Sequence, residues 1–163
     1  MSSTAYIALG SNLDDPSAQI HRALAALAHL PQTELTDCAA WYRSAAVGPG
    51  TQADYINTVV RLYTELAPMD LLHALQAIET AQGRTRTQHW GARTLDLDIL
   101  LYDDLSLNTA ELTLPHPRLT ERNFVLAPLH DLAPELLLSD GKTIERSVKQ
   151  WLANCGSTGI VQL

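Results

Sequence analysis

The chain has 163 residues, of which 46% are hydrophobic and 18% are charged. This apolar content can build a sizeable core and excludes a disordered chain, and the length predicts a single domain over residues 1–163. The formal net charge of −7 argues against a surface that binds nucleic acid or anionic membranes in general. We therefore expect neither nucleic acid nor a membrane among the partners.

The opening segment and the cysteines bear on the location of the protein. The segment MSSTAYIALG lacks the charged and apolar regions of a secretion signal, and no apolar run in the chain approaches the roughly 18 residues of a membrane span. The two cysteines, Cys38 and Cys155, form neither a disulfide framework nor a metal-binding spacing. From these features we expect a cytoplasmic protein.

The first part of the chain predicts a strand and then a helix. Residues 5–13 form a short apolar run that ends in glycine, serine and asparagine, which indicates a strand followed by a turn. Residues 14–30 predict an amphipathic helix, because Asp15 can cap it, Pro16 suits its first position and apolar residues recur on one face.

Two strands and a second helix are predicted next. Residues 34–45 and 55–66 have the composition of strands, and the segment 46–54 between them carries glycine, proline and aspartate, which favour a loop. Residues 67–83 predict a helix with Pro68 near its start and a glycine at its end.

The segment 93–104, RTLDLDILLYDD, predicts a strand with an acidic face. Apolar residues alternate with Asp96 and Asp98, so both carboxylates lie on the same side of the strand. Two like charges about 5 Å apart repel by about 3 kcal/mol at an effective dielectric constant near 20, and by less than about 1 kcal/mol in water. This stretch alone leaves two interpretations open: a solvated face, or a divalent cation such as Mg²⁺ held by both carboxylates.

The order of the predicted elements is β-α-β-β-α-β. This order predicts an α+β, ferredoxin-like fold, which is an antiparallel sheet with both helices on one face. The segments 123–137 and 143–156 follow, and the second of them has an apolar helical face. We expect this C-terminal extension to cover the rest of the sheet.

An arginine-rich segment precedes the acidic strand. Arg84, Arg86 and Arg93 flank Trp90 in the polar stretch 83–93. Arginines that clamp oxyanions beside carboxylates that hold Mg²⁺ are typical of phosphoryl transfer. An acidic chain with such a local arginine cluster suggests a compact anionic ligand.

Two further groups of side chains could bind a ligand. Tyr55 and Asn57 share one face of their strand and combine a flat ring with an amide, which suits a planar heterocycle. The segment 114–124 adds basic and aromatic side chains, namely His116, Arg118, Arg122 and Phe124. The sequence contains no Walker A loop. The segment DGKT at 140–143 resembles the end of one but lacks the earlier glycine that this motif requires.

Four motifs occur along the chain in a specific order: YIALGSNL, VGPG with DYIN, GRTR with WGARTLDLDILLYDD, and LTLPHPRLTERNFVLAPL. Together they closely resemble the 6-hydroxymethyl-7,8-dihydropterin pyrophosphokinase family of folate biosynthesis, from about Tyr6 to Pro134. The resemblance implies an enzyme, an ATP-dependent diphosphokinase. It would transfer pyrophosphate from ATP to the hydroxymethyl oxygen of the pterin and release AMP.

The resemblance also implies a role for each matching residue. Two Mg²⁺ ions would be held by Asp96 and Asp98, with ATP as the co-substrate. The residues that match ATP contacts are Arg84, Arg86, Trp90, Arg93, His116 and Arg122. The residues that match pterin contacts are Val47, Gly48, Tyr55, Asn57, Glu79 and Phe124. The implied catalytic residues are Arg84, Arg93, Asp96 and Asp98.

Two other functions remain as alternatives. A Mg²⁺-dependent ATP hydrolase or kinase would release ADP, and the missing Walker A motif disfavours it. A ferredoxin-like module that binds RNA would need aromatic side chains on a basic sheet face, whereas this strand carries acids. The chain also departs from the family pattern at two positions. His89 stands where the family often has arginine, and Ala92 stands where it often has proline.

We expect the protein to be a monomer.

Overall fold

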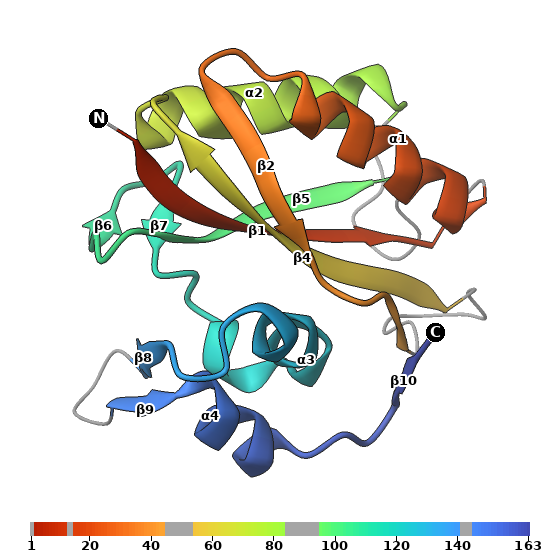
Figure 1. Cartoon of the computed structure of the whole chain (residues 1–163), viewed down its shortest axis with the longest axis vertical. Helices are drawn as coiled ribbons and strands as arrows, with labels where there is room; N and C mark the ends of the chain where they lie inside the picture. The colour runs from red at the N-terminus through yellow and green to blue at the C-terminus, as the bar shows by residue number, and fades with distance from the viewer. Residues whose placement is uncertain (1, 13–14, 45–53, 84–94, 141–144) are drawn as a thin grey trace.

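The computed structural model describes residues 2–12, 15–44, 54–83, 95–140 and 145–163. At its centre, an antiparallel six-stranded sheet has the order β10-β3-β4-β1-β5, and β2 also pairs with β4 (Figure 1). The strands are β1 (Ser3–Ser11), β2 (Thr33–Cys38), β3 (Tyr42–Ser44), β4 (Tyr55–Thr64), β5 (Asp96–Tyr102) and β10 (Ile160–Gln162). The predicted ferredoxin-like sheet is therefore confirmed, with the first strand between the third and the last strands of the β-α-β-β-α-β unit.

The predicted strand over 34–45 is two strands, β2 and β3. Both pair with β4, which at ten residues is long enough to accept them one after the other. Between them, the Ala39 amide donates to the Val59 carbonyl at 3.0 Å. The interruption leaves β3 as a strand of three residues against the start of β4.

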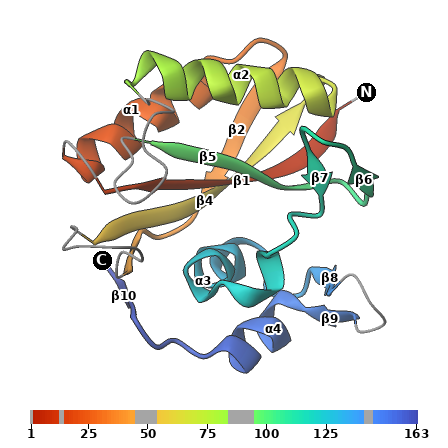
Figure 2. The same ribbon diagram turned by 180° about the vertical axis from the view of Figure 1, so that it is seen from behind.

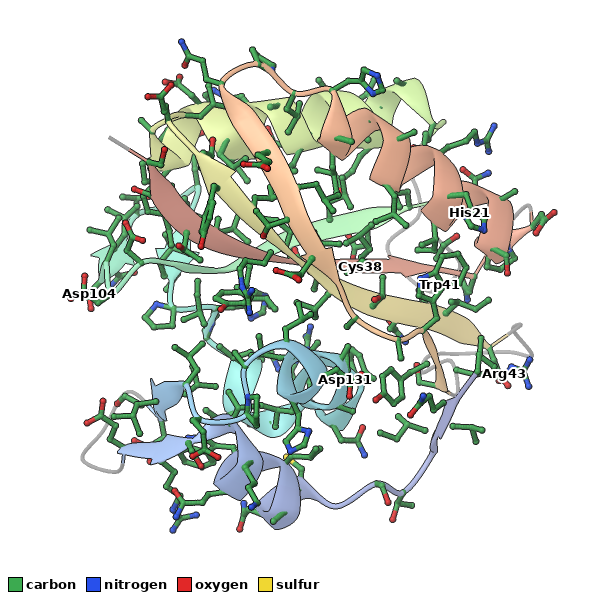
Figure 3. The ribbon with its side chains drawn as sticks, viewed as in Figure 1. His21, Cys38, Trp41, Arg43, Asp104 and Asp131 are labelled. Carbon is green, nitrogen blue, oxygen red and sulfur yellow. The ribbon has the colours of Figure 1, made fainter. Side chains whose placement is uncertain are left out.

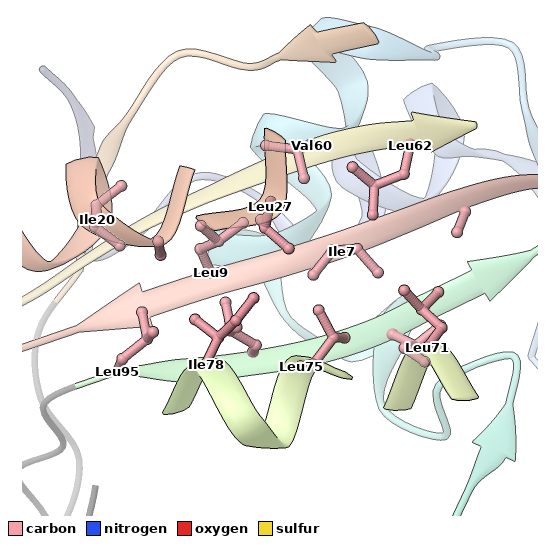
Figure 4. Close-up of a cluster of buried hydrophobic side chains, with 14 of the residues drawn as sticks. Ile7, Leu9, Ile20, Leu27, Val60, Leu62, Leu71, Leu75, Ile78 and Leu95 are labelled. Atoms are coloured by element: carbon pink, nitrogen blue, oxygen red, sulfur yellow. The ribbon is translucent and has the colours of Figure 1, made fainter. Parts of the chain in front are cut away.

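The helices α1 (Pro16–Ala28) and α2 (Pro68–Ala81) lie together on one face of the sheet, as predicted (Figures 1 and 2). The Asp15 carboxylate caps α1 by accepting from the Ala18 amide at 3.3 Å. Their apolar sides and the sheet form the main core, which includes Ile7, Leu9, Ile20, Leu27, Leu71, Leu75 and Leu95 (Figure 4). Each such side chain contributes about 1.5–3 kcal/mol by leaving water.

The C-terminal part of the chain covers the opposite face, also as predicted (Figure 2). It comprises hairpin β6 (Leu107–Asn108) and β7 (Thr113–Leu114), the short helix η1 (Leu119–Glu121), α3 (Asn123–Leu132), hairpin β8 (Leu137–Ser139) and β9 (Glu145–Ser147), and α4 (Val148–Cys155). The helix expected within 143–156 begins only at Val148, because Ser147 and Gln150 form a capping box. None of the helices in the described ranges combines the length and the apolar character needed to cross a membrane.

Strand β5 contributes to both faces of the sheet. Its register with β1 shifts by one residue, which leaves Leu100 without a partner in β1. Before the shift, Asp96 and Asp98 lie on the α3 side, where they line a cavity. After the shift, Leu100 and Leu101 both pack into the core beneath α3. On the face of β5 toward α3, the bulge thus separates the two acidic residues from the buried leucines.

Candidate active site

A cavity of about 420 Å³ lies between the sheet and the start of α3. Its lining combines small, polar, aromatic and charged residues: Ala8, Leu9, Gly10, Ser44, Tyr55, Asn57, Thr58, Asp96, Asp98, Arg118, Glu121, Arg122, Phe124 and Val125. The structure therefore brings together seven residues that the sequence singled out as ligand-binding or catalytic candidates: Tyr55, Asn57, Asp96, Asp98, Arg118, Arg122 and Phe124.

Small residues of the central strand β1 form the floor of this cavity. Gly10 pairs with Asn57 on one side and with Asp96 on the other, and Ala8 pairs with Asp98. Neighbouring strands lie about 4.8 Å apart, so the Cα atoms of Asn57 and Asp96 are roughly 10 Å apart across Gly10. The amide of Asn57 and the carboxylates of Asp96 and Asp98 thus face the same cavity from opposite sides of β1, which has only small residues there.

Asn57 is held in one position on this floor. Its residue is only 7% exposed, and Nδ2 donates to Ser44 Oγ at 2.7 Å. A Cβ atom on residue 10 would lie 3.0 Å from Asn57 Oδ1, so any larger residue than Gly10 would push against the amide. A buried amide with a fixed orientation can recognise the polar edge of a planar ligand.

Asp96 and Asp98 are half-buried, and their carboxylates could hold a metal ion. Among the residues that the structure describes, no cluster of three or more histidine, cysteine, aspartate or glutamate side chains is placed to hold one. Mg²⁺ is commonly held by one or two carboxylates together with the phosphates of its substrate. Two neighbouring carboxylates therefore fit Mg²⁺ that binds together with a nucleotide.

The wall of the cavity opposite the sheet comes from η1 and α3. Arg122 and Phe124 lie at the start of α3, with the Arg122 Cζ atom 5.7 Å from the centre of the Phe124 ring. Tyr55, from β4, lines the same cavity from the sheet side. The site thus has aromatic rings on both of its layers, with a guanidinium stacked beside one of them.

Glu79 lies outside the cavity lining. It is 5% exposed on α2, and its Oε2 atom accepts from the Leu97 amide at 2.8 Å. Leu97 is the residue between Asp96 and Asp98 on β5, so Glu79 holds the backbone that carries the two carboxylates. The contact with the pterin that the sequence suggested for Glu79 stays a prediction.

His116 borders a different cavity, of about 970 Å³, between the β6–β7 and β8–β9 hairpins. The described residues that line this larger cavity include four acids and neither arginine nor lysine, namely Asp103, Asp104, Asp140 and Glu145. It is therefore a poor site for an anion. His116 is nevertheless close enough to Arg122 and Asp96 for their charges to act on it.

We predict that His116 is neutral at pH 7. Burial and the charges of Arg122 and Arg118 lower its pKa from the usual 6.5, and Asp96 opposes them. A neutral ring also agrees with Nδ1 accepting from the Arg118 amide at 3.2 Å. Its contribution to stability is complete above pH 6.5 and is lost as the pH falls through the folded pKa, because the unfolded chain then binds the proton more readily.

Titration of the His116 ring by NMR would measure this pKa directly. Between pH 7.5 and pH 5.5, the free energy of unfolding should fall more in the wild type than in His116→Gln, which has no imidazole to protonate. A His116 pKa at or above 6.5 in the folded protein would contradict the prediction.

Comparison with known proteins identifies the family. Residues 6–134 match the family model of 7,8-dihydro-6-hydroxymethylpterin-pyrophosphokinase, or HPPK. The chain belongs to this family. It is similar to 2-amino-4-hydroxy-6-hydroxymethyldihydropteridine pyrophosphokinase of Haemophilus influenzae, with 47% identity over 91% of this chain and 92% of the relative. The corresponding Pseudomonas aeruginosa protein is 49% identical over 97% of this chain and 95% of the relative.

Solved structures agree on the HPPK fold. The crystal structure of wild-type Plasmodium falciparum HPPK-DHPS with pterin and p-hydroxybenzoate has a TM-score of 0.72 and 12% identity, and covers 94% of this chain and 43% of that chain. HPPK-DHPS in complex with substrates has a TM-score of 0.71 and 13% identity, over 93% of this chain and 45% of that chain. This chain spans less than half of those chains, and at such identities they support the fold alone.

Several residues that the HPPK resemblance singled out lie outside the described residues. They are Val47, Gly48, Arg84, Arg86, Trp90 and Arg93, together with the departures His89 and Ala92. Their roles stay predictions.

Sequence reasoning missed Ala8, Gly10, Ser44 and Glu121, which line the HPPK cavity. One signal could have found two of them. Ala8 and Gly10 are small residues two positions apart on a strand, where such a pair leaves space above the sheet.

Proposed function

We propose that this chain transfers a pyrophosphoryl group from ATP to the hydroxymethyl oxygen of 6-hydroxymethyl-7,8-dihydropterin. One observation carries the proposal: Asn57 and Asp96 flank Gly10 on the same face of the sheet. A flat heterocycle bound at Asn57 would extend its substituent toward the carboxylates. The family assignment supports the same reaction.

The proposed pterin contacts come from both layers of the cavity. Tyr55 and Phe124 would enclose the ring, and Asn57 would bond to its polar edge. Further proposed contacts, from the resemblance, are Val47, Gly48 and Glu79. An aromatic enclosure with one fixed amide gives a site that selects a flat, polar heterocycle.

Asp96 and Asp98 would hold two Mg²⁺ ions, which when bound neutralise phosphate charge and orient the triphosphate. Arg122 would contact the phosphates from the start of α3. The remaining proposed ATP contacts are Arg84, Arg86, Trp90, Arg93 and His116, and Arg84 and Arg93 are also proposed as catalytic residues.

The chemical step is an in-line displacement at the β-phosphorus of ATP. The hydroxymethyl oxygen forms a bond to the β-phosphorus. The bond between the β-phosphorus and the oxygen that bridges it to the α-phosphorus breaks, and AMP leaves with that electron pair. The hydroxyl proton passes to solvent. Positioning and charge neutralisation supply most of the catalysis in such reactions, which suits a cavity of fixed polar groups.

We further propose that the enzyme is a cytoplasmic monomer and forms a single domain over residues 1–163. The proposal of a monomer is checked by light scattering of the purified protein. One peak with the mass of a single chain, 17.8 kDa, is the expected result.

Analysis of the nucleotide product tests the reaction. The protein is incubated with ATP and Mg²⁺, with and without 6-hydroxymethyl-7,8-dihydropterin, and a parallel reaction contains EDTA. AMP should appear only with pterin and Mg²⁺, in equal amount to the pterin diphosphate. Release of ADP would favour the ATP hydrolase or kinase, and ligand binding without turnover would favour a binding module.

A further inference from the structure

The short strand β3 carries one of the residues that fix Asn57. Ser44, the last residue of β3, accepts from Asn57 Nδ2 at 2.7 Å, and both residues line the cavity. β3 pairs with β4 at only three positions, from Tyr42 to Ser44. So short a strand has few hydrogen bonds with which to hold its own position.

β3 is held by a side-chain bond to α3 and by its neighbouring strands. At the first end, the Tyr42 hydroxyl donates to Asp131 Oδ2 of α3 at 2.8 Å. The C-terminal strand β10 pairs with the whole of β3, from Gln162 opposite Tyr42 to Ile160 opposite Ser44. In the described residues, the end of β3 that carries Ser44 is therefore held by its two neighbouring strands, β4 and β10, and β10 closes the edge of the sheet (Figure 1).

The C-terminal tail is fastened at both of its ends. Asn123 Nδ2, beside Phe124, donates to the carbonyls of Gly156 at 3.1 Å and Thr158 at 2.9 Å. At the far end, the Leu163 amide donates to the Trp41 carbonyl at 2.9 Å. Figure 3 shows Trp41 and Arg43 in this region, and Arg43 pairs with Val161 of β10. The tail thus links the start of α3 to β3.

This tail contributes little to the hydrophobic core. Val161 is 60% exposed and Leu163 is 52% exposed. A hollow of about 430 Å³ separates part of the tail from α3 and α4, lined among others by Ala127, Leu152 and Ile160. Removal of β10 should therefore leave the fold in place, because few buried apolar contacts are lost.

We propose that β10 is a positioning element that keeps Ser44, and through it the Asn57 amide, in the orientation that receives the pterin. This inference rests on the proposed function. A looser Ser44 would weaken the hydrogen bond that orders Asn57, so the enzyme would bind pterin less well while its ATP contacts stayed in place.

The test compares the wild type with a chain that ends at Gly159. The KM for pterin should rise about five- to tenfold, the factor expected when one buried hydrogen bond is weakened, and the KM for ATP should change less than about twofold. Val161→Ala is the matched control, because it keeps the backbone of β10 and removes only exposed methyl groups. It should behave as the wild type.

A double-mutant cycle shows whether the tail acts through Ser44. Ser44→Ala alone should raise the KM for pterin, and the truncation should add little in that background, because the shared hydrogen bond is already gone. If the effects of the truncation and of Ser44→Ala on the KM for pterin were additive, the proposal would be overturned. It would also be overturned if the truncation raised the KM for pterin and the KM for ATP and lowered the Tm. An unchanged KM for pterin after truncation would overturn it too.

One measurement is independent of turnover. Exchange of the Asn57 side-chain amide protons, followed by NMR, should become faster when residues 160–163 are removed. If the wild type makes no AMP, the proposed function fails, yet this exchange still decides the role of β10. An unchanged exchange rate would show that β10 does not order Asn57.

Discussion

Asp98→Asn is expected to reduce pyrophosphoryl transfer by about a thousandfold or more, which corresponds to about 4 kcal/mol of transition-state stabilisation. Asparagine keeps the shape of the side chain and loses the charge that a hard cation needs. Without Mg²⁺, the free energy of unfolding of the variant should lie within about 1 kcal/mol of the wild-type value or above it. The reason is that the substitution removes the repulsion between two half-buried carboxylates on one strand face.

The initial rate of AMP formation and urea denaturation check the two parts of this result. Asp104→Asn is the matched control, since Asp104 is an exposed acid just beyond the same strand. It should retain wild-type turnover and affinity. Full turnover in Asp98→Asn would remove the carboxylate pair from the mechanism.

Arg122→Ala is expected to lower kcat/KM by about 100-fold. Hydrogen bonds from a guanidinium to phosphate contribute about 1.5–3 kcal/mol each, and the stacking of Arg122 on Phe124, 5.7 Å from the ring centre, adds to this. The effect should appear in the kinetics of both substrates, because Arg122 would contact phosphate while its neighbour Phe124 encloses the pterin.

Two variants separate charge from geometry at Arg122. Arg122→Lys keeps the charge but not the planar fork, so it should recover only part of the lost kcat/KM. Arg146→Ala removes another stacked arginine, 5.1 Å from the Trp151 ring and away from the cavity, and should leave kcat/KM unchanged. A wild-type kcat/KM for Arg122→Ala would exclude a phosphate contact at this position.

The fold could be predicted where local patterns are strong. The helices α1 and α2 begin at Pro16 and Pro68 as expected, and the alternation around Asp96 and Asp98 placed both on one face. These features depend on residues close together in the sequence. They also sufficed for the order of the sheet, since β-α-β-β-α-β leaves few arrangements.

The parts that could not be predicted depend on contacts between distant residues. The three-residue strands β3 and β10 are too short to show a period of two. β3 forms because β4 has an edge to pair with, and β10 forms on the edge that β3 in turn provides. The role of Ser44 in holding Asn57 likewise needs the register of β3 on β4. Glu79 could be recognised as an acid near the site, but not as the acceptor for the Leu97 amide.

The bare floor of the cavity has a consequence for the thermodynamics of binding. Alanine and glycine have no rotamers to lose, so Ala8 and Gly10 can meet a ligand without any loss of side-chain entropy. The long side chains of Arg118 and Arg122 on the opposite wall can each lose up to about 2 kcal/mol on being ordered. Substitutions that restrict the motion of Arg118 and Arg122 before the ligand binds should therefore tighten binding. Larger residues in place of Ala8 or Gly10 can only fill the space that the ligand needs.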